Sequence, residues 1–308
     1  MKKYFSTGLK GLAMGAADVV PGVSGGTIAL ITGIYEELID SLKSINVKAV
    51  KLLFKEGISA FWSYINGWFL VSVFTGVFIS VFSLAKILET LLATYPILVW
   101  SFFFGLIVAS AIMVLRRITH WNYDKLIAVV AGTVAAYYIT VLTPAQTPET
   151  WWFVLLSGAL AICAMILPGI SGAFILLLLG KYTYVIGAIS SLDIVTIVIF
   201  GVGAVIGLLS FSNLLSYLLR KYHDITIAVL SGFMIGSLNK IWPWKEVVKT
   251  FTDRHGEVKP LLEQNIGPVQ YEQITGNEAF LLYAILFAIA GFALIAAFEF
   301  FATKHKSE

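Results

Sequence analysis

The stretch PGVSGGTIALITGIY, residues 21–35, aligns without gaps on PGISGAFILLLLGKY, residues 168–182. The two copies share a Pro-Gly pair, a Ser-Gly pair, a later glycine and a final tyrosine, at an offset of 147 residues. Farther along the chain, GLIVAS (105–110) resembles GFMIGS (232–237) at an offset of 127 residues. Such self-similarity is the signature of an internal repeat, so the sequence predicts two copies of one structural unit.

The composition excludes an ordinary soluble domain. Of the 308 residues, 58% are hydrophobic and only 13% charged, and the mean hydropathy is +0.88, whereas soluble domains carry about 25% charged residues. The net charge of +3 arises from short basic clusters beside apolar runs, which indicate membrane topology rather than nucleic-acid binding. The single cysteine, Cys163, excludes a disulfide or a cysteine-based metal site within one chain. We expect no metal and no cleaved signal peptide, since Asp18 and Pro21 interrupt the first apolar region.

Six segments are apolar over the roughly 20 residues that a helix needs to cross the hydrocarbon core. They are residues 67–90, 97–115, 126–143, 194–219, 224–241 and 278–302. Two further apolar stretches, 9–40 and 151–190, are interrupted centrally by Pro21-Gly22 and by Pro168-Gly169. Because proline breaks a helix, we expect each of these stretches to be a re-entrant hairpin, which enters and leaves the membrane on the same side.

The distribution of lysine and arginine predicts the topology, because cytoplasmic loops are enriched in both. With two re-entrant hairpins, the main basic clusters all fall on one side; they lie at 2–10, 43–55, 116–125, 220–221 and 304–306. The loop 143–150, which has no basic residue, falls on the other side. The sequence therefore predicts a multi-pass protein of the bacterial cytoplasmic (inner) membrane with both termini in the cytoplasm.

These elements form two predicted repeats. Repeat 1 covers 1–143, with the hairpin 9–40, an interfacial helix or packed connector at 46–65, and the spans 67–90, 97–115 and 126–143. Repeat 2 covers 151–302, with the hairpin 151–190, the spans 194–219, 224–241 and 278–302, and a polar outer loop 242–277 of unassigned role. An odd number of crossings separates the hairpins, so the repeats should be inverted. The predicted fold class is an all-α membrane protein with an inverted repeat, each half a re-entrant broken-helix hairpin plus three transmembrane helices, as in secondary transporters.

The residues after each break suggest an anion site. Ser24, Gly25, Gly26 and Thr27 follow the first break, and Ser171 and Gly172 follow the second. If a helix begins at each serine, two helix N-termini converge, and each carries about half a positive charge. Simple helix capping by the two serines is the alternative interpretation.

Three further side chains have two interpretations each. Asp18 lies at membrane depth, where an acidic residue is costly, so it is a candidate to bind a coupling proton or sodium ion, or else it caps the first loop. Arg116 and Arg117 either receive a phosphate headgroup or only set the topology. We identify no catalytic residue and expect no cofactor other than a coupling ion.

The passages GLAMGAADVVPGVSGGTIALITGIYEELI (11–39), LPGISGAFILLLLGKY (167–182) and GFMIGSLNKIWP (232–243) closely resemble the bacterial polyprenyl-phosphate transporters called PopT. The likeness extends from about residue 8 to 302. It implies a flippase that returns undecaprenyl phosphate, the lipid carrier of cell-wall precursors, from the outer to the cytoplasmic leaflet. By matching motif, it implies that Ser24 to Thr27, with Ser171 and Gly172, bind the phosphate. The second copy departs from the first at Ala173 and Phe174, so we expect the first loop to bind more strongly.

Two alternatives remain open. Membrane undecaprenyl-pyrophosphate phosphatases also combine re-entrant hairpins with a P-G-x-S loop, but they need an arginine in that loop and a nearby base, neither of which is evident here. A small-anion channel or symporter would also use helix N-termini. The residues themselves indicate an anion transporter, and the lipid identity comes from the resemblance. Membrane lipids are the expected partners, without nucleic acid, and the sequence allows a homodimer.

Overall fold

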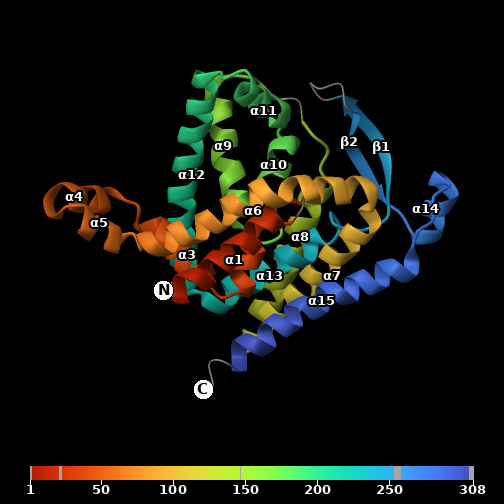
Figure 1. Cartoon of the computed structure of the whole chain (residues 1–308), viewed down its shortest axis with the longest axis horizontal. Helices are drawn as coiled ribbons and strands as arrows, with labels where there is room; N and C mark the ends of the chain where they lie inside the picture. Colours follow the sequence, from red (N-terminus) through yellow and green to blue (C-terminus); the bar gives the residue numbers. More distant parts are fainter. Residues whose placement is uncertain (1, 21–22, 146, 253–257, 305–308) are drawn as a thin grey trace.

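The computed structural model describes residues 2–20, 23–145, 147–252 and 258–304 (Figure 1). The predicted break residues Pro21 and Gly22 lie outside the described residues. The first half contains α1 (Lys2–Val19), α2 (Gly25–Ile31), α3 (Tyr35–Ser44), α4 (Val47–Glu56), α5 (Ile58–Tyr64), α6 (Gly67–Thr94), α7 (Pro96–Leu115) and α8 (Tyr123–Val141). The second half contains α9 (Trp151–Ile166), α10 (Gly172–Leu178), α11 (Tyr182–Ser190), α12 (Ile194–Lys221), α13 (His223–Ser237), β1 (Lys245–Thr252), β2 (Val258–Asn265), α14 (Pro268–Thr275) and α15 (Leu281–Lys304).

The helices confirm a helical membrane protein. Among the described residues, α6, α7, α8 and α12 are long and apolar enough to span a membrane. A fifth span is present if α10 and α11, which meet at a bend of 110°, count as one. The other two predicted spans are shorter than expected, since α13 has only 15 residues and the apolar part of α15 is Leu281–Ala297. The sidedness of the membrane and the inversion of the repeat stay predictions.

Within each half, the first helix packs through glycine on the first long span of that half, α1 on α6 and α9 on α12. A Cβ atom on Gly11 of α1 would lie 2.2 Å from the carbonyl oxygen of Val73 in α6. A Cβ atom on Gly158 of α9 would lie 2.3 Å from the carbonyl oxygen of Phe200 in α12. Gly158 and Phe200 are the positions that the repeat offsets assign to Gly11 and Val73, so equivalent residues make equivalent contacts. Small residues allow membrane helices to approach this closely.

The other two long pairs join the halves to each other. A Cβ atom on Gly105 of α7 would lie 1.8 Å from the carbonyl oxygen of Ala288 in α15. At the equivalent position of the second half, a Cβ atom on Gly232 of α13 would lie 2.3 Å from the carbonyl oxygen of Val129 in α8. The last helix of each half thus packs on the middle span of the other, so neither half forms its helix bundle alone.

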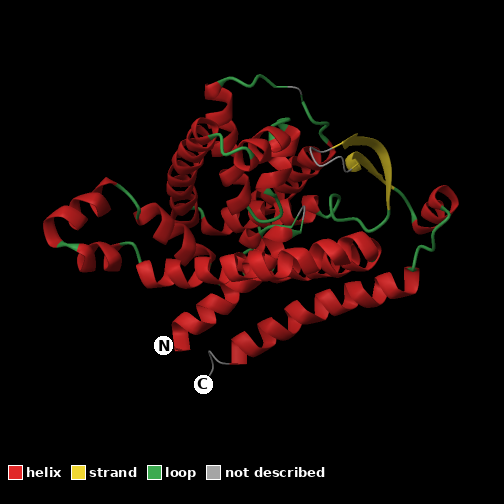
Figure 2. Cartoon of the chain, turned by 45° about the horizontal axis from the view of Figure 1, so that its top comes forward, coloured by secondary structure: helices red, strands yellow, loops and turns green. Residues whose placement is uncertain are grey.

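The segments outside these pairs are peripheral. Helices α4 and α5 project from one side (Figures 1 and 2) and expose apolar side chains, Phe54 at 83% and Ile58 at 74%.

The loop 242–277 contains the antiparallel hairpin β1–β2 and the helix α14. Trp244 fixes this loop to the helical body, since its side chain is buried and its indole nitrogen donates to the Ala279 carbonyl (2.9 Å). The two strands are the one addition to the expected all-helical fold within the described residues.

The contact at Gly105 generates a stability prediction. In Gly105→Ala the new methyl group collides with backbone rather than with a side chain that can move, and overpacking costs about 1–3 kcal/mol. The matched control is Gly201→Ala in α12, because nothing lies within 4 Å of a Cβ atom there. Thermal unfolding in detergent should show a lower midpoint for Gly105→Ala and an unchanged or higher midpoint for Gly201→Ala. Equal midpoints would contradict the close α7–α15 approach.

Candidate functional site

The two interrupted segments are in direct contact inside the helix bundle. Three hydrogen bonds join them: Ser24 Oγ donates to the Met165 carbonyl (3.0 Å), the Gly169 amide donates to Thr27 Oγ1 (3.0 Å), and Tyr35 Oη donates to the Ile166 carbonyl (3.2 Å). Ser24, Thr27 and Tyr35 are each at most 1% exposed. Residues 131 to 142 positions apart therefore satisfy each other's polar groups at the breaks.

The first loop already binds a negative charge. Ser24 is the N-cap of α2, and its hydroxyl accepts from the Gly26 amide (3.1 Å). The Gly25 amide donates to the Asp18 carboxylate (2.7 Å), so an acidic side chain occupies the position that a helix N-terminus offers to an anion. A ligand phosphate at these amides would have to displace Asp18. This hydrogen bond corresponds to the capping role of Asp18. Its role in binding a coupling ion stays a prediction.

The second loop keeps more of its donors. Ser171 is the N-cap of α10, but its side chain makes no capping hydrogen bond. The first amides of a helix have no partner within the helix, and no side chain of the described residues caps Gly172 or Ala173. Ser171 and Gly172 are buried, whereas Ala173 is exposed. The sequence favoured the first loop as the binding element, but the available donors lie in the second loop.

The second break is shaped by Gly169. Its φ of +83° is in the left-handed region, which only glycine adopts without strain. A Cβ atom at this position would also lie 2.8 Å from Ser237 Oγ and 2.9 Å from the Phe233 carbonyl oxygen. Pro168 precedes it in the same turn and is buried. The end of α13 is therefore packed directly against this break.

The far end of α2 is held by cations that sequence reasoning did not place there. Arg117 donates from Nη1 to the Leu30 carbonyl (3.0 Å) and from Nη2 to the Ile31 carbonyl (2.9 Å). Lys10 Nζ donates to the Thr32 carbonyl (2.9 Å). Positive side chains stabilise the C-terminal carbonyls of a helix, so Arg117 helps to position α2. Headgroup recruitment by Arg116 and Arg117 stays a prediction.

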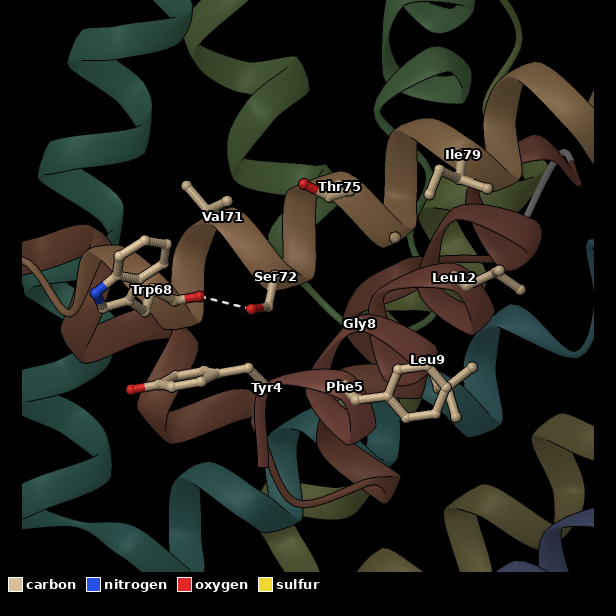
Figure 3. A pocket seen from close by; sticks show the side chains of 11 residues that line it. Tyr4, Phe5, Gly8, Leu9, Leu12, Trp68, Val71, Ser72, Thr75 and Ile79 are labelled. Atoms are coloured by element: carbon tan, nitrogen blue, oxygen red, sulfur yellow. Dashed lines mark hydrogen bonds between the residues drawn. The ribbon is translucent and has the colours of Figure 1, made fainter. Parts of the chain in front are cut away.

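Two cavities adjoin α1. One, of about 160 Å³, borders the joined breaks and is lined by Asp18, Gly26 and Tyr35 among apolar side chains. The other is an apolar groove of about 880 Å³ between α1 and α6 (Figure 3). The one hydrogen bond drawn there runs from Ser72 Oγ to the carbonyl of Trp68, within α6. The groove offers no charged group, so it suits a lipid chain but no headgroup.

Broken helices that meet inside a bundle of membrane-spanning helices are typical of one class of protein, the polytopic membrane transporters. The chain belongs to the undecaprenyl phosphate translocase-like (VCA0040-like) family, whose family profile matches residues 14–259. This confirms the resemblance noted in the sequence.

Two relatives are named polyprenyl-phosphate transporters. The one from Vibrio cholerae serotype O1 is 50% identical over 301 residues, which cover 98% of each chain. The one from Staphylococcus aureus is 32% identical over 253 residues, which cover 76% of this chain and 85% of the relative. No solved structure matches the chain. The relatives are transporters by name, which confirms the expected class, a transporter rather than an enzyme.

The arginine pair generates a prediction. Arg117→Gln removes both hydrogen bonds from the guanidinium to α2, and bonds that involve a charged group contribute about 1.5–3 kcal/mol. Arg116→Gln is the matched control, because Arg116 is exposed like Arg117 but makes no hydrogen bond to α2. Limited proteolysis or hydrogen exchange should show faster opening of residues 25–34 in Arg117→Gln only. Similar behaviour of the two variants would show that Arg117 does not hold α2.

Proposed function

We propose that this protein is a flippase that moves undecaprenyl phosphate from the outer to the cytoplasmic leaflet of the bacterial cytoplasmic membrane. The observation that carries the proposal is the hydrogen-bonded meeting of the two broken segments, since it places polar backbone where a transporter needs a path. The substrate is inferred from the relatives, which are named polyprenyl-phosphate transporters. This function is also compatible with a homodimer.

An amphiphilic substrate suits this arrangement. The polyprenyl chain can remain in the lipid while only the phosphate crosses, and a phosphate in hydrocarbon without hydrogen bonds is costly. In the proposed path the phosphate binds the Ser171 hydroxyl and the amides of Gly172 and Ala173. It then displaces Asp18 from the Gly25 amide and the Ser24 hydroxyl from the Gly26 amide. Thr27, whose hydroxyl accepts from Gly169, keeps the two loops in register.

Asp18 is the proposed coupling group. While its carboxylate holds the Gly25 amide, the N-terminus of α2 is closed to a phosphate by occupation and by like charge. Binding of a proton or sodium ion to Asp18 would weaken that hold, so cation entry and phosphate entry would be linked.

The serines test the proposed path. In vesicles that contain the purified protein, leaflet exchange of labelled undecaprenyl phosphate should exceed exchange in protein-free vesicles. Ser171→Ala should slow exchange without lowering the unfolding midpoint, because this hydroxyl makes no capping bond. Ser24→Ala should slow exchange and also lower the midpoint, because it loses the bond to Met165. Wild-type exchange at the protein-free rate would refute the flippase.

Asp18→Asn provides a separate test of coupling. This variant should retain exchange but lose its dependence on pH or on sodium, measured with each gradient imposed in turn. Unaltered ion dependence would exclude Asp18 as the coupling group.

Two other measurements would favour the alternative functions. Chloride conductance that polyprenyl phosphate does not affect would favour the small-anion channel or symporter, and phosphate release from undecaprenyl pyrophosphate would favour the phosphatase-like enzyme.

A further inference from the structure

A polar pocket lies where the β1–β2 hairpin covers the ends of α8 and α13. It has a volume of about 450 Å³, and its polar lining includes Lys240, Lys245, Glu263, Asn239 and Asn265. Asn265 Nδ2 donates to the backbone carbonyl of Asn239 (2.7 Å) and to its side-chain oxygen (2.9 Å), which fixes β2 to the end of α13. The loop 242–277, without a role in the sequence analysis, therefore builds one wall of a defined site.

Lys245 is buried in this pocket without a hydrogen bond. Its side chain is 8% exposed, and no hydrogen-bond partner for Nζ exists among the described residues. The ammonium lies 4.1 Å from the centre of the Trp100 ring, a favourable cation–π position. The nearest carboxylate oxygen, Glu263 Oε2, is 3.6 Å away. An ammonium has three donors, and leaving them unused in a buried site is costly. Within the described chain, Lys245 therefore has a carboxylate at ion-pair distance but no acceptor within hydrogen-bond distance.

The charges in the pocket do not balance. Glu263 Oε2 accepts from Lys240 Nζ at 3.1 Å, so two ammonium groups face one carboxylate. Burial lowers the pKa of Lys245 to about 8, with Glu263 partly opposing the shift and Lys240 adding to it. Burial acts to raise the pKa of Glu263, but Lys245 and Lys240 outweigh it, and the pKa of that carboxyl is lowered. A second anion in the pocket would neutralise the excess positive charge.

An apolar groove leads away from the pocket. It runs between α8 and α13, has a volume of about 410 Å³, and includes Val134 and Ile235. Tyr137 and Asn239 line both the groove and the polar pocket. A cationic pocket that adjoins an apolar groove matches a ligand with an anionic head and a hydrocarbon chain.

We propose that this pocket binds the phosphate monoester headgroup of a polyprenyl phosphate on Lys240 and Lys245, with the first isoprene units in the groove between α8 and α13. The inference rests on the proposed function and gives it a loading site, at the end of the protein predicted to face outward. Glu263 competes with the phosphate for the same ammonium groups. Lys240 also lies 5.0 Å from the ring of Phe174 in α10, so the loading site adjoins the second break.

Substitution of Lys245 tests the site directly. Purified protein in detergent is titrated with farnesyl phosphate, a short soluble analogue, and binding is followed by calorimetry or by the fluorescence of tryptophans such as Trp100. Lys245→Met should bind roughly tenfold more weakly or worse, as expected for a lost hydrogen bond to a charged group. Lys249→Met is the matched control, an exposed lysine of the same strand, and should bind like the wild type. Equal affinity of Lys245→Met and the wild type would overturn the inference.

Glu263→Gln separates binding from a structural ion pair. If Glu263 competes with the ligand, this variant should bind farnesyl phosphate more tightly than the wild type, even where its unfolding midpoint falls. If the two lysines only anchor the hairpin, the variant should not gain affinity. Unchanged or weaker binding by Glu263→Gln at a temperature where it is folded would count against the pocket.

The charge state of Lys245 provides a third test. The groups that face it are Lys240, Glu263 and the Trp100 ring, and a phosphate monoester, with its second pKa near about 6, stays a dianion above neutral pH. Affinity for farnesyl phosphate should therefore fall as pH rises past 8 and Lys245 loses its proton. Lys245→Arg keeps its charge and should hold its affinity to pH 9.5. A parallel fall in both proteins would contradict the assignment.

Companion ligands identify the source of the phosphate. Farnesol should not compete, and inorganic phosphate should compete only weakly, because it does not fill the groove. Inorganic phosphate that binds as tightly as farnesyl phosphate would overturn the lipid assignment. Vesicle exchange separates this inference from the proposed function: Lys245-dependent binding without exchange refutes only the flippase, while exchange that Lys245→Met leaves unchanged refutes only the loading site.

Discussion

The arrangement of this protein depends on the mutual satisfaction of backbone polar groups at two helix breaks. Inside a bilayer no water is available to unpaired amides and carbonyls, so a broken helix is tolerated only where protein or a cavity supplies partners. Here the two breaks supply partners for each other. The Ser24 hydroxyl donates to the carbonyl of Met165, and the Thr27 hydroxyl accepts from the amide of Gly169. The consequence is that neither break can form alone. A rearrangement of one loop must release hydrogen bonds of the other, which couples the two halves of the chain at the point where a substrate would pass.

The close glycine contacts complement this coupling. Equivalent residues of the two halves make equivalent contacts, with Gly105 on Ala288 and Gly232 on Val129 as the pairs that cross between halves. Contacts this close depend on shape and transmit displacement, since a tightly packed interface has few intermediate arrangements. Closely packed helix pairs thus surround the two breaks. The helices that follow the breaks, α2 and α10, are short, with seven residues each.

The sequence predicted what depends on local pattern and failed where tertiary contacts decide. Apolar length identified four of the six spans, and proline placement identified the break at Pro168, because both effects act within one segment. The predicted span 224–241 continued past Ser237 on the strength of Leu238 and Ile241, but in the structure α13 ends at Ser237, where the polar residues Asn239 and Lys240 turn to meet the outer loop. The hydrogen bonds from Arg117 to the end of α2 join residues that are 86 and 87 positions apart, and no spacing rule indicates them. The sequence assigned no role to Lys240, at the end of a predicted span, or to Lys245, in the outer loop, because only the hairpin brings Glu263 beside them.

Two carboxylates lie at the two places where we propose that phosphate binds. Asp18 holds an amide at the start of α2, and Glu263 holds the paired lysines under the hairpin. Without an anion, the amides at one place and the ammonium groups at the other would be buried without partners, which lowers the stability of the folded protein. An internal carboxylate reduces that cost, since it accepts from the Gly25 amide at one place and from Lys240 at the other, while Lys245 is left without a hydrogen bond within the described chain. A carrier must also release its cargo, and a site that binds the cargo too tightly cannot do so. In the proposed path, binding at either place exchanges one negative group for another, so the buried charge changes little.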